Sequence, residues 1–278
     1  MMRERIERGS LRALVRDLDG AHAPEIRRAV RDIVRRYDDR GALLVEVETL
    51  VGAAEPAARH VACGLLPRCH NDDPSRAAKL LEQLSKDRDW TVREAANQAA
   101  GSILRASFAP ALEWLRGFAT SDSAHVRRCV PVAAMKAGRS RRLEYAEPLL
   151  KLVTPLLADR DPIVRRSLGP MAIGSGLLGF YPNPTFEYLV QWSTSNDEQV
   201  LWNVAMSFSG SCAAPIARKA MIVLRKLSLD PRRYVWRAVA SAVWKLGRRR
   251  AEVVRPELAR WLEDEDRVHV ARAAMRHL

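Results

Sequence analysis

The chain is 278 residues long, which is enough to bury a large hydrophobic core in one or two domains. With 47% hydrophobic and 28% charged residues and ordinary numbers of Gly and Pro, the composition excludes disordered and collagen-like chains. Lys and Arg outnumber Asp and Glu by 46 to 33, and the resulting net charge of +13 favours a polyanionic partner, either nucleic acid or an anionic membrane surface.

The sequence shows neither an apolar leader segment nor an apolar run long enough to span a membrane. The first residues, MMRERIERGS, carry charge with no apolar segment behind them, and no apolar run approaches the roughly 20 residues of a membrane span. We therefore expect a cytoplasmic, nucleoid-associated protein with no membrane partner. The cysteines form no CxxC pair and no recurring zinc spacing, which predicts reduced, mostly buried thiols and no metal site; they are Cys63, Cys69, Cys129 and Cys212.

In chain order, the sequence shows a helix start that recurs about every 35 residues. Each copy has an acidic or polar residue, a short gap, and an aliphatic residue. The aligned aliphatic residues, in two weaker upstream copies and six clear ones, are Ile26, Val61, Val92, Val126, Val164, Val200, Val235 and Val270. Each unit contains two amphipathic helical patterns, and no strand signal appears. We predict an all-α chain, a right-handed α-solenoid of about eight HEAT-like helix pairs in a single domain over residues 1–278, with the best-matching repeats at about 75–278.

Two prolines fall inside the second helical patterns of adjacent central units. Pro131 and Pro170 are predicted to kink or break these helices, because proline lacks the N–H that an α-helix needs. The stretch that follows, at residues 169–184, is the least regular part of the sequence.

Arginine residues stand next to the aligned aliphatic position in most copies. Second helices usually line the extended binding surface of a solenoid, so these side chains are predicted to form a ladder that meets successive phosphates. The predicted DNA-binding arginines are Arg93, Arg127, Arg128, Arg165, Arg166, Arg232, Arg233 and Arg237. The first Arg of each Val-Arg step has an alternative, structural role. In a HEAT unit this arginine pairs with an Asp of the neighbouring unit.

The tryptophans divide into two groups by their place in the repeat. Trp90, Trp202 and Trp236 lie at or beside second-helix starts, where they are predicted to stack on bases or sugars, although core packing is the alternative. Trp114, Trp192 and Trp261 lie on the apolar faces of first helices and are predicted to belong to the core.

The segments DWTVREAANQA, HVRRCV and IVRRSLG resemble the bacterial HEAT-like DNA alkylation repair glycosylases, the AlkC and AlkD family, over roughly residues 75–210. The resemblance implies a solenoid that cradles duplex DNA with alkylated bases and cleaves the glycosidic bond of an alkylated purine, without a metal or redox cofactor. It also implies that Trp90 and Glu94 are the aromatic and acidic residues of the active-site helix.

The four-residue spacing places Trp90 and Glu94 on one helix face. The ring is then able to stack on the deoxyribose while the carboxylate lies near the positive charge that develops there, or positions the attacking water. The alternative for Glu94 is a solvated residue that the helix dipole favours.

The sequence departs from the AlkC-like pattern at three places, where Val132, Pro170 and Gly174 replace polar residues. Binding features are thus retained better than catalytic ones. We expect a DNA-binding protein of alkylation repair, either an alkylpurine DNA glycosylase acting through Trp90 and Glu94 or a non-catalytic damage binder. The alternative is a non-catalytic HEAT scaffold that binds a protein. The oligomeric state stays open.

Overall fold

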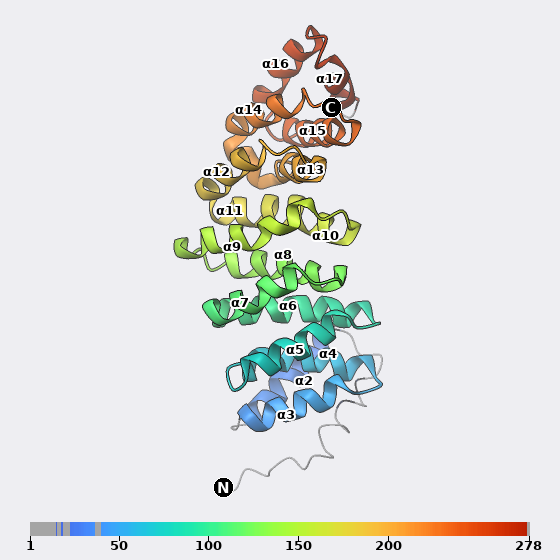
Figure 1. Cartoon of the computed structure of the whole chain (residues 1–278), viewed down its shortest axis with the longest axis vertical. Helices are drawn as coiled ribbons and strands as arrows, with labels where there is room; N and C mark the ends of the chain where they lie inside the picture. The colour runs from blue at the N-terminus through green and yellow to red at the C-terminus, as the bar shows by residue number, and fades with distance from the viewer. Residues whose placement is uncertain (1–14, 16–17, 19–22, 37–39, 277–278) are drawn as a thin grey trace. The chain divides into compact units, whose positions relative to one another are not determined.

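The computed structural model describes residues 15, 18, 23–36 and 40–276, and every regular element among them is a helix (Figure 1). The all-α fold predicted from the sequence is confirmed. The chain divides into two compact units, Met1–Ala133 and Ala134–Leu278. The prediction that residues 1–278 act as one domain stays a prediction.

The first unit consists of paired helices stacked in two layers. Helices α2, α4 and α6 pack in succession in one layer, and α3, α5 and α7 form the other. Their bounds are α2 Ala23–Arg36, α3 Arg40–Val51, α4 Pro56–Cys69, α5 Pro74–Ser85, α6 Trp90–Ala106 and α7 Phe108–Ala119. Helix α8 follows at Ala124–Gly138 and runs through the boundary between the units.

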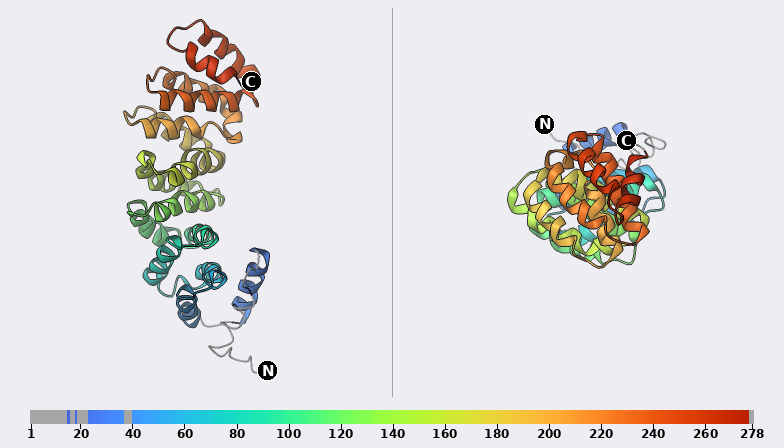
Figure 2. Two further views of the ribbon diagram at one scale, coloured as in Figure 1. Left: turned by 90° about the vertical axis from the view of Figure 1, so that its right-hand side faces the viewer. Right: turned by 90° about the horizontal axis from the view of Figure 1, so that it is seen from above.

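The second unit repeats this arrangement (Figure 2). Its second helices α13, α15 and α17 pack in succession, and α14 and α16 pack beside each other in the layer of first helices. The bounds of the α-helices are α9 Ala146–Val153, α10 Pro162–Ser167, α11 Leu178–Phe180, α12 Pro182–Trp192, α13 Glu198–Ser207, α14 Ala217–Leu227, α15 Arg233–Gly247, α16 Ala251–Leu262 and α17 Val268–Met275. The other helical segments are the 3-10 turns η1 Leu143–Tyr145, η2 Thr154–Ala158 and η4 Ser211–Ile216 and the π-helix η3 Leu168–Leu177.

One loop geometry accounts for the recurring helix start. A carboxylate or hydroxyl accepts a hydrogen bond from the backbone N–H two residues later, which turns the chain into the second helix. This bond is made by Asp87, Ser121, Asp159, Ser195, Asp230 and Asp264. The valine five residues after the loop residue is fully buried in several copies, as at Val92, Val126, Val164 and Val235. The repeat seen in the sequence is therefore a repeat of loop chemistry and core contact.

The loop contacts shift the register of one upstream copy. The Nη1 atom of Arg59 donates to the carbonyls of Ala53 and Ala54, six and five residues earlier. Arg93 and Arg127 donate to carbonyls at the same two separations. Ala58, and not Val61, is thus the counterpart of Val92. The alignment at Val61 was wrong by three residues because the small Ala58 carries little apolar signal.

The two interrupting prolines have different outcomes. Helix α8 continues through Pro131 to Gly138, so of the predicted kink or break, the break does not occur there. Pro170 lies inside the π-helix η3, where the wider turn replaces α-helical bonding. This segment also packs closely against α13. Gly169 donates its N–H to the side chain of Asn203, and Asn203 is fully buried.

No single helix in the described part of the chain is long and apolar enough to cross a membrane. The pair formed by residues 198–207 and 211–227, bent by 87°, satisfies length and composition only when taken together.

Candidate nucleic-acid interface

The start of α6 presents an exposed tryptophan. Asp89 caps this helix by accepting hydrogen bonds from the N–H groups of Thr91 and Val92, at 2.8 and 3.4 Å. The cap fixes Trp90 as the first helical residue, and 69% of its surface is exposed. Trp90 is therefore not packed in the core, which was the alternative for this tryptophan. A large ring held in solvent by a capped helix is available for stacking.

Glu94 lies one helical turn after Trp90 and is tied to the next repeat. Arg128 of α8 donates from Nη2 to Glu94 Oε2 at 2.7 Å, and Gln98 donates to Oε1 at 3.2 Å. Partial burial raises the pKa of Glu94, but the Arg128 guanidinium, with the side chains of Gln98 and Asn97, outweighs burial and lowers the pKa below its ordinary value. Glu94 is therefore ionised at neutral pH, as a base or an electrostatic stabiliser requires, and it is not a proton donor.

The first arginine of two Val-Arg steps clamps its own loop. Arg93 donates to the carbonyls of Asp87 and Arg88 at 2.7 and 2.9 Å. Arg127 makes the equivalent pair of bonds to Ser121 and Asp122, at 2.9 and 3.0 Å. Part of each guanidinium is thus committed to the repeat itself.

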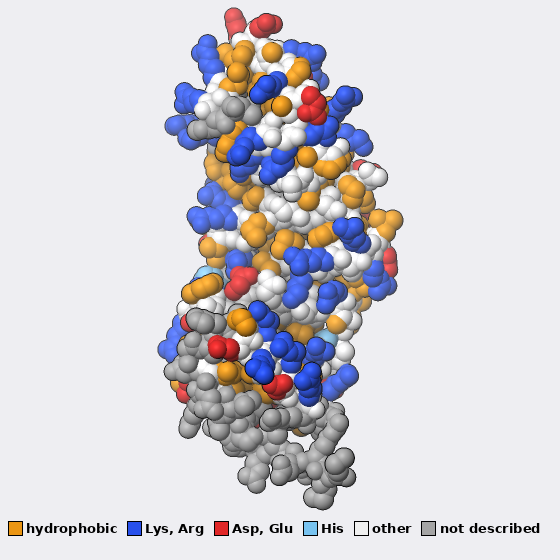
Figure 3. Space-filling view, turned by 180° about the vertical axis from the view of Figure 1, so that it is seen from behind, with side chains coloured by type: hydrophobic (Ala, Val, Ile, Leu, Met, Phe, Trp, Pro, Cys, Tyr) orange, Lys and Arg blue, Asp and Glu red, His pale blue; other side chains and the backbone are white. Residues whose placement is uncertain are grey.

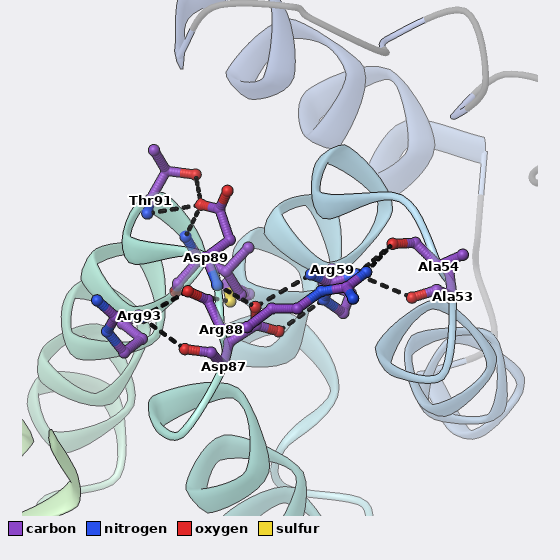
Figure 4. A network of polar contacts seen from close by, with 10 residues as sticks. Ala53, Ala54, Arg59, Asp87, Arg88, Asp89, Thr91 and Arg93 are labelled. Atoms are coloured by element: carbon purple, nitrogen blue, oxygen red, sulfur yellow. Dashed lines mark hydrogen bonds and ion pairs between the residues drawn. The ribbon is translucent and has the colours of Figure 1, made fainter.

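The ion pair with an Asp of the neighbouring unit, which the alternative assigned to these first arginines, occurs at Arg59 (Figure 4). Its guanidinium donates to both carboxylate oxygens of Asp87, at 2.6 and 3.0 Å. The two side chains are only 7% and 8% exposed. Figure 4 shows how this bridge joins the loop before α4 to the loop before α6, with Arg93 on the other side of the same loop. The sequence interpretation missed Arg59 because of the register shift.

In the second unit, Arg165 departs from the loop-clamping pattern. Its Nη1 donates to the hydroxyl of Tyr234 at 2.6 Å, and that hydroxyl donates to Gln199 Oε1 at 2.6 Å. The guanidinium also lies over the ring of Trp202, 5.4 Å from the centroid. The rings of Trp202 and Tyr234 are stacked, with centroids 6.0 Å apart and an interplanar angle of 15°.

The structure thereby brings two predicted residues, Arg165 and Trp202, into one cluster with two that the sequence interpretation missed. Gln199 and Tyr234 come from second-helix starts one and two units further along, within the segments NDEQVLWN and DPRRYVWR. An aromatic residue directly before the aligned Val235 was the available signal for Tyr234.

The remaining predicted arginines and the third tryptophan differ in how much of each side chain is held by contacts within the protein. Arg232 is held by both oxygens of Asp230 and by the carbonyl of Asn196. Trp236 is half-buried and meets the ring of His269 edge-on, with centroids 4.9 Å apart. The exposed members of the set are Arg166, Arg233 and Arg237.

The three positions that depart from the AlkC-like pattern have structural reasons. Val132 is buried, with 5% of its surface exposed, and contributes to the core. Pro170 belongs to the π-helix η3. A Cβ atom on Gly174 would lie 2.4 Å from the backbone oxygen of Ser207, so no carboxylate fits at this position while α13 packs there.

A cavity of about 800 Å³ lies elsewhere in the first unit, between α5 and α7. It is lined in part by Trp114, which is partly exposed, whereas Trp192 and Trp261 are buried in the second unit as predicted. Trp90 and Glu94 do not line this cavity. The exposed tryptophan and the paired carboxylate are therefore not part of this cavity.

The described residues offer little for a metal. They contain no group of three or more His, Cys, Asp or Glu side chains placed to hold an ion. Cys63, Cys69 and Cys129 are buried, as expected, and burial raises the pKa of Cys69 and Cys129 to about 12. Cys212 is partly exposed. Thiols with such pKa values stay protonated and are poor ligands and nucleophiles.

Basic side chains are more abundant than acidic ones on the face drawn in Figure 3. The paired helices and the second-helix arginines define a basic helical-repeat protein of the HEAT type. A family model described as "DNA alkylation repair enzyme" matches residues 15–172, which is more than half of the chain. The chain therefore belongs to the DNA alkylation repair enzyme family.

Two karyopherin structures share the helical-repeat fold at low sequence identity. A mutant of Kap121p aligns with a TM-score of 0.53 at 15% identity, over 95% of this chain and 33% of that one. The karyopherin Kap121p bound to the extreme C-terminus of the protein phosphatase Cdc14p gives 0.52 at 15% identity, with the same coverage. Smu.31 from Streptococcus mutans UA159 gives 0.41 at 15% identity, over 98% of both chains. The chain spans about a third of the karyopherin chains that it matches. No curated protein matches it.

Proposed function

We propose that this protein binds duplex DNA containing alkylated bases and excises alkylated purines as a DNA glycosylase. The observation that carries the proposal is the exposed ring of Trp90 beside the ionised carboxylate of Glu94, within the residues that match the DNA alkylation repair family. Such a protein works at chromosomal DNA, which places it at the nucleoid in the cytoplasm.

The proposed reaction requires no redox step. The bond between C1′ and the purine nitrogen breaks, and its electron pair leaves with the base, whose positive charge is thereby neutralised. Trp90 covers the deoxyribose, and Glu94 stabilises the positive charge that develops on the sugar. A water molecule then adds to C1′ and loses a proton to Glu94 or to solvent. Arg128 holds the carboxylate in the ionised form for either role.

DNA binding rests on the second-helix starts of both units. Three of the proposed arginines are exposed, so that binding phosphate disturbs the fold least; they are Arg166, Arg233 and Arg237. The other proposed contacts are Arg93, Arg127, Arg128, Arg165, Trp202, Arg232 and Trp236, of which Arg93, Arg127 and Arg232 also hold loops.

A second candidate is non-catalytic binding of alkylated DNA. It is favoured by the packing of α13 against η3, which leaves no space for a side chain at Gly174. Under this function the same ring and arginines recognise the lesion, and no base is released.

Release of 3-methyladenine and 7-methylguanine from methylated duplex DNA tests the glycosylase. We expect release by the wild-type protein, and a loss of at least about 100-fold for Glu94→Gln, in line with the contribution of a positioned acid–base group. Glu113→Gln is the matched control, because Glu113 also pairs with an Arg but lies on α7. No release by the wild-type protein, with retained affinity for methylated DNA, selects the second candidate. Equal release by wild type and Glu94→Gln removes Glu94 from the reaction.

A further inference from the structure

The groove between α14 and α16 in the second unit is lined in part by apolar side chains that are open to solvent, which we call its floor. Its cavity measures about 280 Å³, which is the space of one or two large side chains and not of a whole ligand. Ile222, Val253 and Pro256 line it, and 63% of the surface of Ile222 is exposed. An exposed isoleucine that lines a groove gains free energy when another apolar group covers it.

Basic side chains also line this groove, and we call them its rim. Arg218, Arg225 and Arg260 line it, and the last two share one carboxylate: Glu257 accepts from Arg225 at 3.4 Å and from Arg260 at 3.1 Å. Each guanidinium has five N–H donors, so one carboxylate leaves most of their capacity unused. The other acidic residue of the lining, Glu252, is paired with Arg250 at 2.5 Å.

The surroundings add to this positive charge. Helices α14 and α16 carry six Lys and Arg residues against two Glu, and residues 248–250 add three more Arg directly before α16. An excess of this size attracts and orients anionic groups from a distance. A ligand of the groove is therefore negatively charged as well as apolar.

The positive charge and the exposed apolar surface of the groove together decide between nucleic acid and peptide as its ligand. A phosphate backbone gains from the arginines but has no group that profits from covering Ile222. A peptide with carboxylates and a large apolar side chain satisfies the rim and the floor at once. The groove also lies in the layer of first helices, whereas the DNA contacts proposed for this unit lie on or directly before the second helices α10, α13 and α15.

We propose that this groove binds an acidic segment of a protein partner, with one or two large apolar side chains placed over Ile222 and the carboxylates held by Arg218, Arg225 and Arg260. The site is separate from the proposed DNA contacts, and it recruits a partner whether or not the protein excises bases.

Fluorescence anisotropy with two labelled peptides tests the groove on the full chain. One probe has five aspartates followed by two phenylalanines, and in the other probe two serines replace the phenylalanines. We expect the phenylalanine probe to bind about tenfold more tightly, because only it covers the floor. Ile222→Ser removes this advantage and leaves the serine probe unchanged. Arg218→Glu weakens both probes about fivefold or more.

Lys226→Glu is the matched control, because Lys226 is exposed on the same helix but does not line the groove. It is expected to change either affinity less than about twofold, as for an exposed charge outside the groove that is screened at physiological salt. Equal binding of the two probes, or an unchanged advantage in Ile222→Ser, overturns the proposal. So does a Lys226→Glu effect equal to that of Arg218→Glu. Displacement of the phenylalanine probe by duplex DNA, with DNA binding weakened by Ile222→Ser, assigns the groove to nucleic acid instead.

Discussion

Arg128 donates a hydrogen bond to Glu94 across 2.7 Å, from the second helix of one repeat to the second helix of the repeat before it. The two side chains are 26% and 39% exposed, so the pair is partly desolvated but still reachable from solvent. Water screens such a pair, and its main effect is on the protonation of Glu94 more than on the stability of the fold. A single contact thus joins a proposed catalytic residue to a proposed DNA contact.

The first prediction concerns the pKa of Glu94. In the wild-type protein the carboxyl is expected to titrate below its ordinary value, because Arg128 and the neighbouring amides outweigh partial burial. In Arg128→Ala, burial acts against fewer opposing groups, so the pKa rises. Carboxyl-carbon NMR of Glu94 measures this directly. A wild-type value at or above that of Arg128→Ala contradicts the prediction.

The lowered pKa of Glu94 also determines how fold stability and base release depend on pH. A carboxylate whose pKa is lower in the folded than in the unfolded state stabilises the fold above the unfolded pKa, and this contribution disappears as the pH falls through the folded pKa. If Glu94 is the base, release of methylated purines is constant through neutral pH and declines only in acid. Arg128→Ala moves that decline to higher pH.

A second prediction separates buried from exposed ion pairs. Arg59→Ala leaves Asp87 buried without its partner and also removes two donors from loop carbonyls. We expect a loss of about 3 kcal/mol or more in the free energy of unfolding, measured with urea. Arg76 pairs with Glu48 in a setting where the side chains are 38% and 46% exposed. Arg76→Ala is therefore expected to cost less than about 1 kcal/mol, and equal losses for the two variants contradict the assignment.

The sequence predicted the helices and the repeat because their causes are local. A polar loop residue, a cap and a buried valine recur within about eight residues, as at Asp87, Asp89 and Val92. The contacts of Arg165 were not predictable in this way, since its hydroxyl partner lies 69 residues away on Tyr234. That contact depends on the rise and rotation between successive repeats, which the sequence pattern does not contain. Trp90 and Glu94 were proposed from a resemblance, and their roles stay predictions.

A third prediction contrasts two glycines inside helices. A methyl group on Gly174 would meet the backbone oxygen of Ser207 at 2.4 Å, and a helix backbone does not move aside cheaply. We expect Gly174→Ala to lower the free energy of unfolding by about 2 kcal/mol or more. Gly117 has no heavy atom within 4 Å of such a methyl group. Gly117→Ala in α7 is therefore expected to stabilise the protein by about 0.5–1 kcal/mol, because alanine restricts the unfolded chain. Thermal unfolding of both variants checks the pair, and a neutral Gly174→Ala refutes the close packing of η3 and α13.

The last prediction distinguishes an arginine that is proposed only to bind DNA from one that also holds the repeat together. Arg166 is exposed, whereas Arg93 donates to two loop carbonyls. Arg166→Ala is expected to reduce the slope of log K against log salt by about 0.9 for duplex DNA, because one phosphate contact is lost, with unfolding unchanged. Arg93→Ala is expected to lower the free energy of unfolding by about 1–3 kcal/mol, since it leaves loop carbonyls without donors. Salt titrations and urea unfolding of both variants measure the two quantities. If Arg166→Ala leaves the slope unchanged, the second-helix arginines of this unit do not follow the phosphate backbone.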